Sequence, residues 1–265
     1  MKIGIHELNE EDSAKANAII SEFFGTPCSI IEGDTSYNNG RSFVADKQYR
    51  LNINGIRHVG IKLKYDVAFR HENEFLVRDI RVKIGVSNTM IKKIRGFPMD
   101  GQKWRDTDCL ISDWGPMGQR EDLQTLLPSV ISHDKTIFLE ELGKVSAFSY
   151  ALGLWDRRPS NFVWDKNEKK MISIDHEALV DDEIDVNITA SLSNVIVKFF
   201  GANWYADKDL KLTFESGFNT IWAEMVRKRA EIADIYDVYT KGKKELFMQR
   251  IFKSSAIPLG LIMMQ

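Results

Sequence analysis

The chain has 265 residues, of which 43% are hydrophobic and 28% are charged, and its net charge at pH 7 is -2. This length can bury a sizeable core, and it corresponds to one domain of two lobes or to two small domains. Because the charge is nearly balanced, the chain has no general attraction to nucleic acid or to anionic membranes, and nucleic-acid binding is disfavoured.

The cysteines and the hydropathy narrow the class of protein further. Cys28 and Cys109 are the only two cysteines, and without a C-x-x-C spacing they predict neither a zinc site nor a disulfide framework. The N-terminus has no apolar signal core, and no apolar run reaches the roughly 18 residues that a membrane-spanning helix requires. We therefore expect a cytoplasmic protein without a transmembrane segment.

The first predicted element is a helix over residues 9–24. Capping and acidic residues stand at its start, apolar residues follow at helical spacing, and a Gly-Thr-Pro run ends it. Residues 29–32 are then expected to form a strand. Residues 33–40, rich in Gly, Asn and Ser, are expected to form a loop with turns.

A strand is next predicted over residues 59–64, where alternation places Lys62 and Lys64 on the same face. Taken alone, both lysines can be solvated charges that keep a sheet edge from pairing. Residues 71–85 follow as a helix, because apolar residues recur in register and a glycine stops the pattern.

Two further strands are expected at residues 90–95 and 108–112. Glycine and proline are concentrated over residues 113–118, so the chain is expected to change direction there. We interpret Trp114 as a plug of this turn more than as a stacking partner for a ligand, because most Trp side chains lie in or near the core.

A helix over residues 138–152 is expected to lead into the stretch with the strongest chemical signal, since apolar residues recur along one of its faces. Residues 161–164 and 171–174 are predicted to be short strands joined by a polar turn. Such a hairpin brings Asn161 and Asp175 to the same end.

Asp156, Asn161 and Asp175 are the residue types that phosphoryl transfer from a nucleotide needs. Asp156 and Asn161 lie five residues apart on a loop, and Asp175 follows 14 residues later. One carboxylate must orient the attacking hydroxyl, while an amide oxygen and a second carboxylate hold the magnesium ions beside the phosphates. The alternative is a surface loop and hairpin with scattered acids, because Asp and Asn are frequent in turns.

The C-terminal part is predicted to be helical over residues 188–200 and 214–239, after an acidic loop at 181–185. No Ser/His/Asp or Cys/His nucleophilic arrangement is recognisable. The five histidines lack the spacing of a metal site.

The run Asp-Arg-Arg-Pro-Ser-Asn at residues 156–161, followed by Ile-Asp at 174–175, resembles the catalytic loop and metal-binding motif of the atypical protein-kinase-like fold. That branch includes the phosphatidylinositol 3/4-kinases, the HipA-type bacterial kinases and the actin-fragmin kinase. The spacing of Asp and Asn also fits ordinary protein kinases. Two departures are Leu-Trp at 154–155 in place of His-Arg and His-Glu at 176–177 in place of Phe-Gly, and the second argues against a Phe-based switch.

The resemblance implies an α+β fold of two lobes: a small lobe with an antiparallel sheet and one helix, and a mainly helical large lobe. We assign residues 1–28 to an N-terminal helical extension that braces the small lobe. Residues 29–113 would form the small nucleotide-binding lobe, and residues 114–265 the helical catalytic lobe.

The same resemblance assigns the cofactors, ATP and Mg²⁺, and the central roles. Asp156 would be the catalytic base or the group that orients the acceptor hydroxyl, and Asn161 and Asp175 would be the Mg²⁺ ligands. Arg158 stands where some relatives have a functional His.

Lys62 would hold the nucleotide phosphates, since the fold uses a lysine of its third strand for this. Glu74 would orient Lys62, because it lies in a stretch that resembles the Asn-Glu-x-Leu opening of the corresponding HipA-type helix. Lys64 and Glu72 stay open as alternatives for this pair.

ATP would also be held by main-chain groups at two places. The loop from Ser36 to Gly40 would contact the phosphates by close approach of its N–H groups, although it lacks the G-x-G-x-x-G spacing. The main chain of Ile111, Ser112 and Asp113 would hydrogen-bond adenine at the hinge.

The function that these expectations describe is ATP- and Mg²⁺-dependent transfer of phosphate to an alcohol, by an atypical protein serine/threonine kinase. Residues 175–197 contain six carboxylates and no Lys or Arg, which favours a basic protein substrate over an anionic lipid headgroup. The alternatives are a phosphatidylinositol or other small-molecule kinase and a nucleotide-binding pseudokinase.

Overall fold

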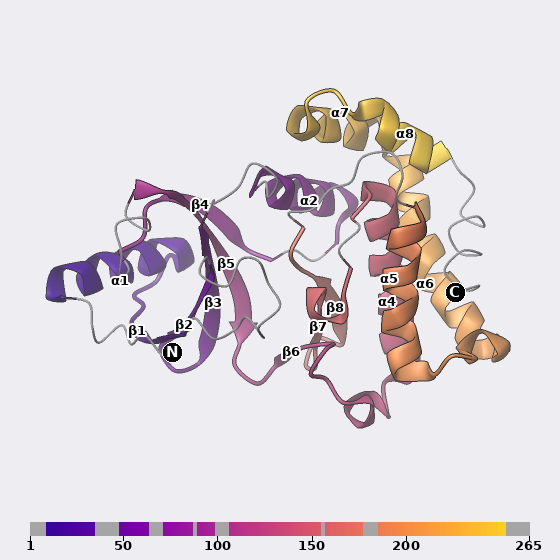
Figure 1. Cartoon of the computed structure of the whole chain (residues 1–265), viewed down its shortest axis with the longest axis horizontal. Coiled ribbons are helices and arrows are strands. Elements are labelled where there is room, and N and C mark those ends of the chain that lie inside the picture. The colour runs from indigo at the N-terminus through magenta and orange to yellow at the C-terminus, as the bar shows by residue number, and fades with distance from the viewer. Residues whose placement is uncertain are drawn as a thin grey trace. The chain divides into compact units, whose positions relative to one another are not determined.

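The computed structural model describes residues 9–34, 48–63, 71–86, 89–98, 106–154, 157–176 and 185–252. The chain divides into two compact units, Met1–His71 with Thr89–Arg120, and Glu72–Asn88 with Glu121–Gln265. The first unit is built on an antiparallel sheet, and the second is mainly helical (Figure 1). The expected α+β class is confirmed.

Five strands form the sheet of the first unit: β1 (Ile30–Asp34), β2 (Gln48–Ile53), β3 (Arg57–Leu63), β4 (Ile91–Arg95) and β5 (Asp108–Pro116). Their order in the sheet is β1-β2-β3-β5-β4, with antiparallel neighbours throughout. β5 therefore lies between β3 and β4, and hydrogen-bonds a strand along each edge. The antiparallel sheet agrees with the small lobe that the sequence predicts.

Helix α1 (Glu10–Phe24) packs on this sheet, as expected for a bracing helix. The side chain of Asn9 caps its start by accepting from the N–H of Asp12 (2.8 Å), and Gly25 ends it in the left-handed conformation. Its buried apolar residues share one core with the sheet; this core contains Ala16, Ile20, Phe23, Ile30, Leu51, Ile53, Val59 and Ile61.

Helix α2 (His71–Ile84) has the predicted bounds but belongs to the second unit. Its apolar face, with Leu76, Val77, Ile80 and Ile84, is part of the core of that unit. Polar contacts tie it to the C-terminal helices as well, since Tyr239 donates to Asp79 (2.5 Å) and Lys228 to the carbonyl of Lys83 (2.6 Å). The small lobe that the sequence predicts, residues 29–113, includes this helix.

The second unit contains a small sheet and five further α-helices among its described residues. The sheet has the order β6-β7-β8, from β6 (Arg120–Asp122), β7 (Phe162–Asp165) and β8 (Lys170–Ser173). The helices are α4 (Lys135–Leu152), α5 (Asp185–Phe200), α6 (Lys208–Arg227), α7 (Arg229–Thr240) and α8 (Lys244–Phe252), with short 3-10 turns at Pro128–Ile131, Pro159–Asn161 and Trp204–Ala206. The run predicted as one helix over 214–239 is two helices that meet at Lys228.

Helix α4 is the centre of the second unit. Its residues Phe138, Leu142, Val145, Phe148 and Leu152 are all buried, which confirms the predicted apolar face. On another side it approaches α6 so closely that a Cβ at Gly217 would lie 1.9 Å from the carbonyl oxygen of Glu140. The two helix backbones are therefore in direct contact, which only glycine permits.

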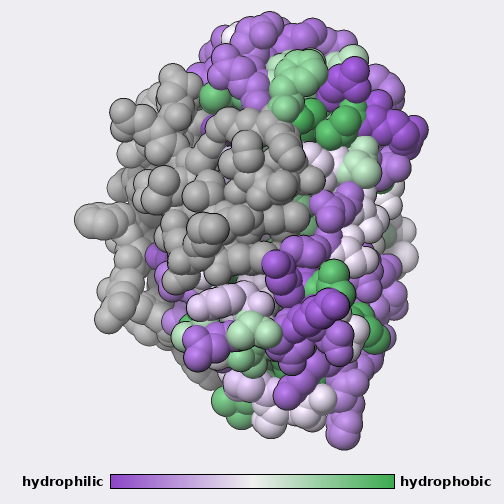
Figure 2. Space-filling view, turned by 90° about the vertical axis from the view of Figure 1, so that its right-hand side faces the viewer, coloured by the Kyte–Doolittle hydropathy of each residue, from purple (hydrophilic) through white to green (hydrophobic). Residues whose placement is uncertain are grey.

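Part of the described surface of the second unit is mainly polar. Figure 2 shows mainly hydrophilic residues over its coloured part, with hydrophobic residues in small separate groups. This agrees with helices that turn their apolar faces inward. Within the described ranges, no helix combines the length and the apolar character that crossing a membrane would take.

Gly217→Ala should destabilise the fold by about 2 kcal/mol or more, although alanine favours helices, because the new methyl group overlaps the α4 backbone. The exposed neighbour Ser216 provides the control, since Ser216→Ala adds no contact with α4. Thermal unfolding followed by circular dichroism measures both variants. An unfolding temperature of Gly217→Ala equal to that of Ser216→Ala would refute the close contact.

Candidate functional site

The loop with the strongest chemical signal starts where α4 ends. Gly153 closes the helix with a left-handed φ of 70° and donates its N–H to the carbonyls of Ser149 and Tyr150. Asp156 lies outside the described residues, so its predicted role stays a prediction. The chain continues from Arg157 through the 3-10 turn Pro159–Asn161 into β7.

Asn161 and Asp175 meet at the same end of the β7–β8 hairpin, as predicted. Phe162 is the register partner of Ser173, and the N–H of Ile174 donates to the carbonyl of Asn161 (2.9 Å). Asn161 is buried, with 4% of its surface exposed, and Asp175 is half-buried. Folding of the hairpin therefore brings the main chain at these two distant sequence positions to one place.

The donor set at this place fits Mg²⁺. Asn161 and Asp175 offer an amide and a carboxylate oxygen, the hard ligands that Mg²⁺ takes from proteins together with phosphate and water. The described residues hold no cluster of three or more His, Cys, Asp or Glu.

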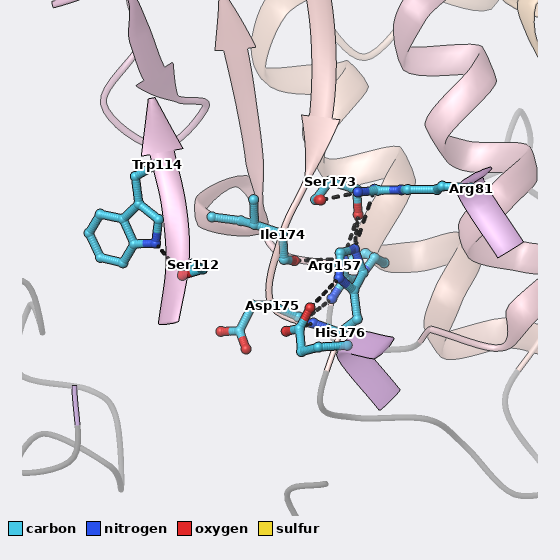
Figure 3. Close-up of polar contacts among 9 residues, drawn as sticks. Arg81, Ser112, Trp114, Arg157, Ser173, Ile174, Asp175 and His176 are labelled. Carbon is cyan, nitrogen blue, oxygen red and sulfur yellow. Dashed lines mark hydrogen bonds and ion pairs between the residues drawn. The ribbon is translucent and has the colours of Figure 1, made fainter. Parts of the chain in front are cut away.

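Asp175 has an unusual main-chain conformation. Its φ of 59° lies in the left-handed region, where residues other than glycine are uncommon, although Asp and Asn are enriched there. Its carboxylate points away from Arg157 and His176 (Figure 3). The conformation directs the side chain to the side of the segment opposite the buried polar network described next.

Arg157 is fully buried and bonds to the end of β8. Its guanidinium donates to Ser173 Oγ (2.9 Å), to the carbonyl of Ile174 (3.0 Å) and to the carbonyl of Asp175. The guanidinium also lies over the ring of Phe162, with 5.8 Å from Cζ to the ring centroid. One side chain thus holds three consecutive residues.

Glu74, in the first turn of α2, binds His176, the residue that follows Asp175. Its Oε1 accepts from the N–H of His176 (2.7 Å), and its Oε2 lies 2.8 Å from His176 Nδ1. Since a carboxylate only accepts, Nδ1 carries the proton, and Nε2 accepts from the hydroxyl of Ser173 (2.9 Å). Glu74 is 8% exposed and His176 3%, so this network is buried.

Electrostatics agree with a neutral imidazole. The pKa of His176 is lowered to about 4, mainly by burial and in smaller part by the nearby Arg81 and Arg157, against the attraction of the Glu74 carboxylate. Burial also lowers the pKa of Arg81 to about 10, which leaves its guanidinium charged at pH 7. Arg81 donates to the carbonyl of Ser173 (2.9 Å).

The predicted phosphate clamp is Lys62, which lies on β3, the third strand, as expected. It is half-buried, and its register partners are Gln48 on β2 and Leu110 on β5. Lys62 and Glu74 belong to different units, and their pairing stays a prediction. The alternative Lys64, like Ser36 and Gly40 of the predicted phosphate loop, lies outside the described residues, while the alternative Glu72 is on α2 and half-buried.

The change of direction predicted over residues 113–118 comes later in the structure, and the residues predicted to contact adenine are Ile111, Ser112 and Asp113. These residues lie inside β5, which continues to Pro116, and Ser112 has register partners on both β3 and β4. The N–H of Asp113 already donates to the carbonyl of Met90 (2.9 Å). Glycine and proline at residues 115–116 therefore belong to the last residues of the strand, and contact of Ile111, Ser112 and Asp113 with adenine stays a prediction.

Trp114 packs on the sheet, against β3. A Cβ built on Gly60 would lie 2.4 Å from its indole, so the ring covers β3 where the glycine leaves room. Its Nε1 donates to the hydroxyl of Ser112 (3.0 Å; Figure 3). The glycine and the hydroxyl together fix this ring.

Sequence reasoning missed most of the buried network around Asp175. It considered Arg158, which is exposed, and assigned no role to its neighbour Arg157, which is fully buried. It noted His176 only as a departure from the kinase pattern. The sequence offered one signal, a His at position 176 where the kinase pattern has Phe. Only the fold shows that His176 contacts Glu74 on α2.

No family model and no curated protein matches the chain. Among solved structures, 44 chains match. One of them is "WaaP in complex with acyl carrier protein", with 12% sequence identity and a TM-score of 0.38; the match covers 78% of this chain and 87% of that chain. At this identity and TM-score the likeness carries no argument about function, which therefore depends on the geometry of the site itself.

Proposed function

We propose that the protein is an ATP- and Mg²⁺-dependent phosphotransferase that transfers the γ-phosphate to a serine or threonine hydroxyl of a protein. The observation that supports this most is the meeting of Asn161 and Asp175 at the end of the β7–β8 hairpin. Both side chains offer oxygen ligands for Mg²⁺. Asp156, the candidate base, lies five residues before Asn161. Phosphoryl transfer needs this combination of groups.

Each residue would have a distinct task. Asn161 and Asp175 would hold Mg²⁺, which neutralises charge on the phosphates when it is bound. Asp156 would orient the acceptor hydroxyl and take its proton. Lys62 would hold the phosphates as a point charge on a rigid strand.

The acceptor is proposed from charge. The carboxylates of residues 175–197, which occur without any Lys or Arg, would attract a cationic peptide and repel a headgroup that carries phosphate esters. Of these carboxylates, Asp175 is the one whose side chain the structure describes. The acidic character is a property of the sequence and motivates a direct comparison of acceptors.

Asp175→Asn should abolish the thermal stabilisation that ATP with Mg²⁺ gives, because bound ligand raises the unfolding temperature and the variant loses a charged metal ligand. Asparagine keeps the size of the side chain and tolerates the left-handed conformation, so the fold should persist. Differential scanning fluorimetry measures the shift. An undiminished shift would remove Asp175 from the site.

Asp156→Asn should lower turnover by about 10²-fold or more while ATP still binds, because only the positioned proton acceptor is lost. Asp209→Asn, at an exposed position of α6, is the matched control and should transfer phosphate at the wild-type rate. Initial rates with γ-labelled ATP give the comparison. Transfer by Asp156→Asn at the rate of the control would show that this loop is not catalytic.

A basic peptide library should be labelled by the protein with γ-labelled ATP and Mg²⁺, whereas phosphoinositide vesicles should not be. Autoradiography after separation of lipid from peptide distinguishes the two acceptors. Labelled lipid without labelled peptide would replace the protein acceptor with a lipid one and leave phosphoryl transfer standing. Absence of label from both, and from a cell extract, would contradict the proposed function.

A further inference from the structure

The three residues that follow β8 are held from several directions. The N–H of Ile174 donates to the carbonyl of Asn161, and the carbonyls of Ile174 and Asp175 accept from Arg157. The N–H of His176 donates to Glu74. The β7 hairpin, the loop before it and α2 therefore each fix one part of this short irregular segment.

The hydrogen bonds to this segment account for its unusual main-chain conformation. A left-handed residue other than glycine persists only where its surroundings impose that conformation, and Asp175 has a φ of 59°. In this conformation the direction of its carboxylate is set by the main chain. Figure 3 shows the carboxylate on one side and the buried network on the other.

Ser173 connects the two halves of the network. Its hydroxyl accepts from Arg157 (2.9 Å) and lies 2.9 Å from Nε2 of His176, whose other nitrogen bonds to Glu74. Because Nδ1 of His176 carries the proton, the Ser173 hydroxyl is the donor to Nε2. A continuous chain of hydrogen bonds thus runs from Arg157 to α2.

From these contacts we infer that Arg157 and Ser173 are positioning residues for Asp175, which orient its carboxylate for Mg²⁺ without touching the ion. The inference rests on the proposed function, in which Asp175 is a Mg²⁺ ligand. The planar guanidinium of Arg157 reaches three acceptors at once, whereas a lysine ammonium in its place is a point charge without that fork. Arg157→Lys therefore keeps the charge and removes the geometry.

The test is a comparison of ATP affinity with and without metal. The dissociation constant of ATP is measured by calorimetry in Mg²⁺ and in EDTA, and their ratio is the gain in affinity due to the ion. The proteins are wild type, Asp175→Asn, Arg157→Lys and Ser173→Ala. Arg227→Lys, at an exposed arginine that binds Glu224, is the matched control.

We expect Asp175→Asn to bring the ratio close to one and Arg157→Lys to reduce it about tenfold or more, the usual loss for a group that orients a metal ligand. Ser173→Ala should reduce the ratio roughly threefold to tenfold, as expected for one lost hydrogen bond. Arg227→Lys should match wild type. The affinity in EDTA should be equal in all proteins, because a residue that only supports the fold would weaken binding in both conditions alike.

The outcomes separate the two claims. If Asp175→Asn loses the gain while Arg157→Lys and Ser173→Ala keep it, or if these two weaken binding equally with and without Mg²⁺, the positioning role is overturned and the proposed function stands. If Asp175→Asn keeps the full gain, or wild type shows none, the proposed function itself fails. Should Arg157→Lys not fold, Ser173→Ala decides the question of positioning.

Discussion

The candidate site depends on the hydrogen bonds that hold the segment after β8, residues 174–176. Arg157 and Glu74, both buried, bind its main chain at Ile174, Asp175 and His176. Buried charges of this kind are stable only when their hydrogen bonds are satisfied, so the segment and the charged groups hold each other in place. The position of Asp175 beside Asn161 follows from this mutual dependence.

Helix α2 extends the same constraint into the core. Its apolar residues lie in the core of the second unit, and Lys228 and Tyr239 bind its C-terminal half. Glu74 at its other end then reaches His176. Since α2 is fixed along its length, Glu74 keeps a fixed position beside the segment that carries Asp175.

Sequence patterns predicted the elements that have strong local signals. The bounds of α2 were found because apolar periodicity ends at Gly85, and the hairpin was found because two short apolar runs flank a polar turn. The break at Lys228 was not found, because no glycine or proline marks it. The end of β5 was placed too early, because glycine and proline at residues 115–116 continue the strand instead of ending it.

The candidate site was predicted only in part, because sequence patterns report local structure. Asn161 and Asp175 could be paired because a hairpin brings its ends together, which is a local rule. Arg157 could not be separated from Arg158 by sequence, because only burial in the fold distinguishes two neighbouring arginines. The contact between Glu74 and His176 joins residues 102 positions apart and depends on the packing of α2.

The proposed function requires that Asn161 and Asp175 bind Mg²⁺ together with ATP. Its most direct test is a crystal structure with Mg²⁺ and a non-hydrolysable ATP analogue. We expect an ion at about 2.1 Å from the side-chain oxygens of Asn161 and Asp175 and from the phosphates, the distance typical of Mg²⁺. A nucleotide bound with its Mg²⁺ away from both side chains would contradict it.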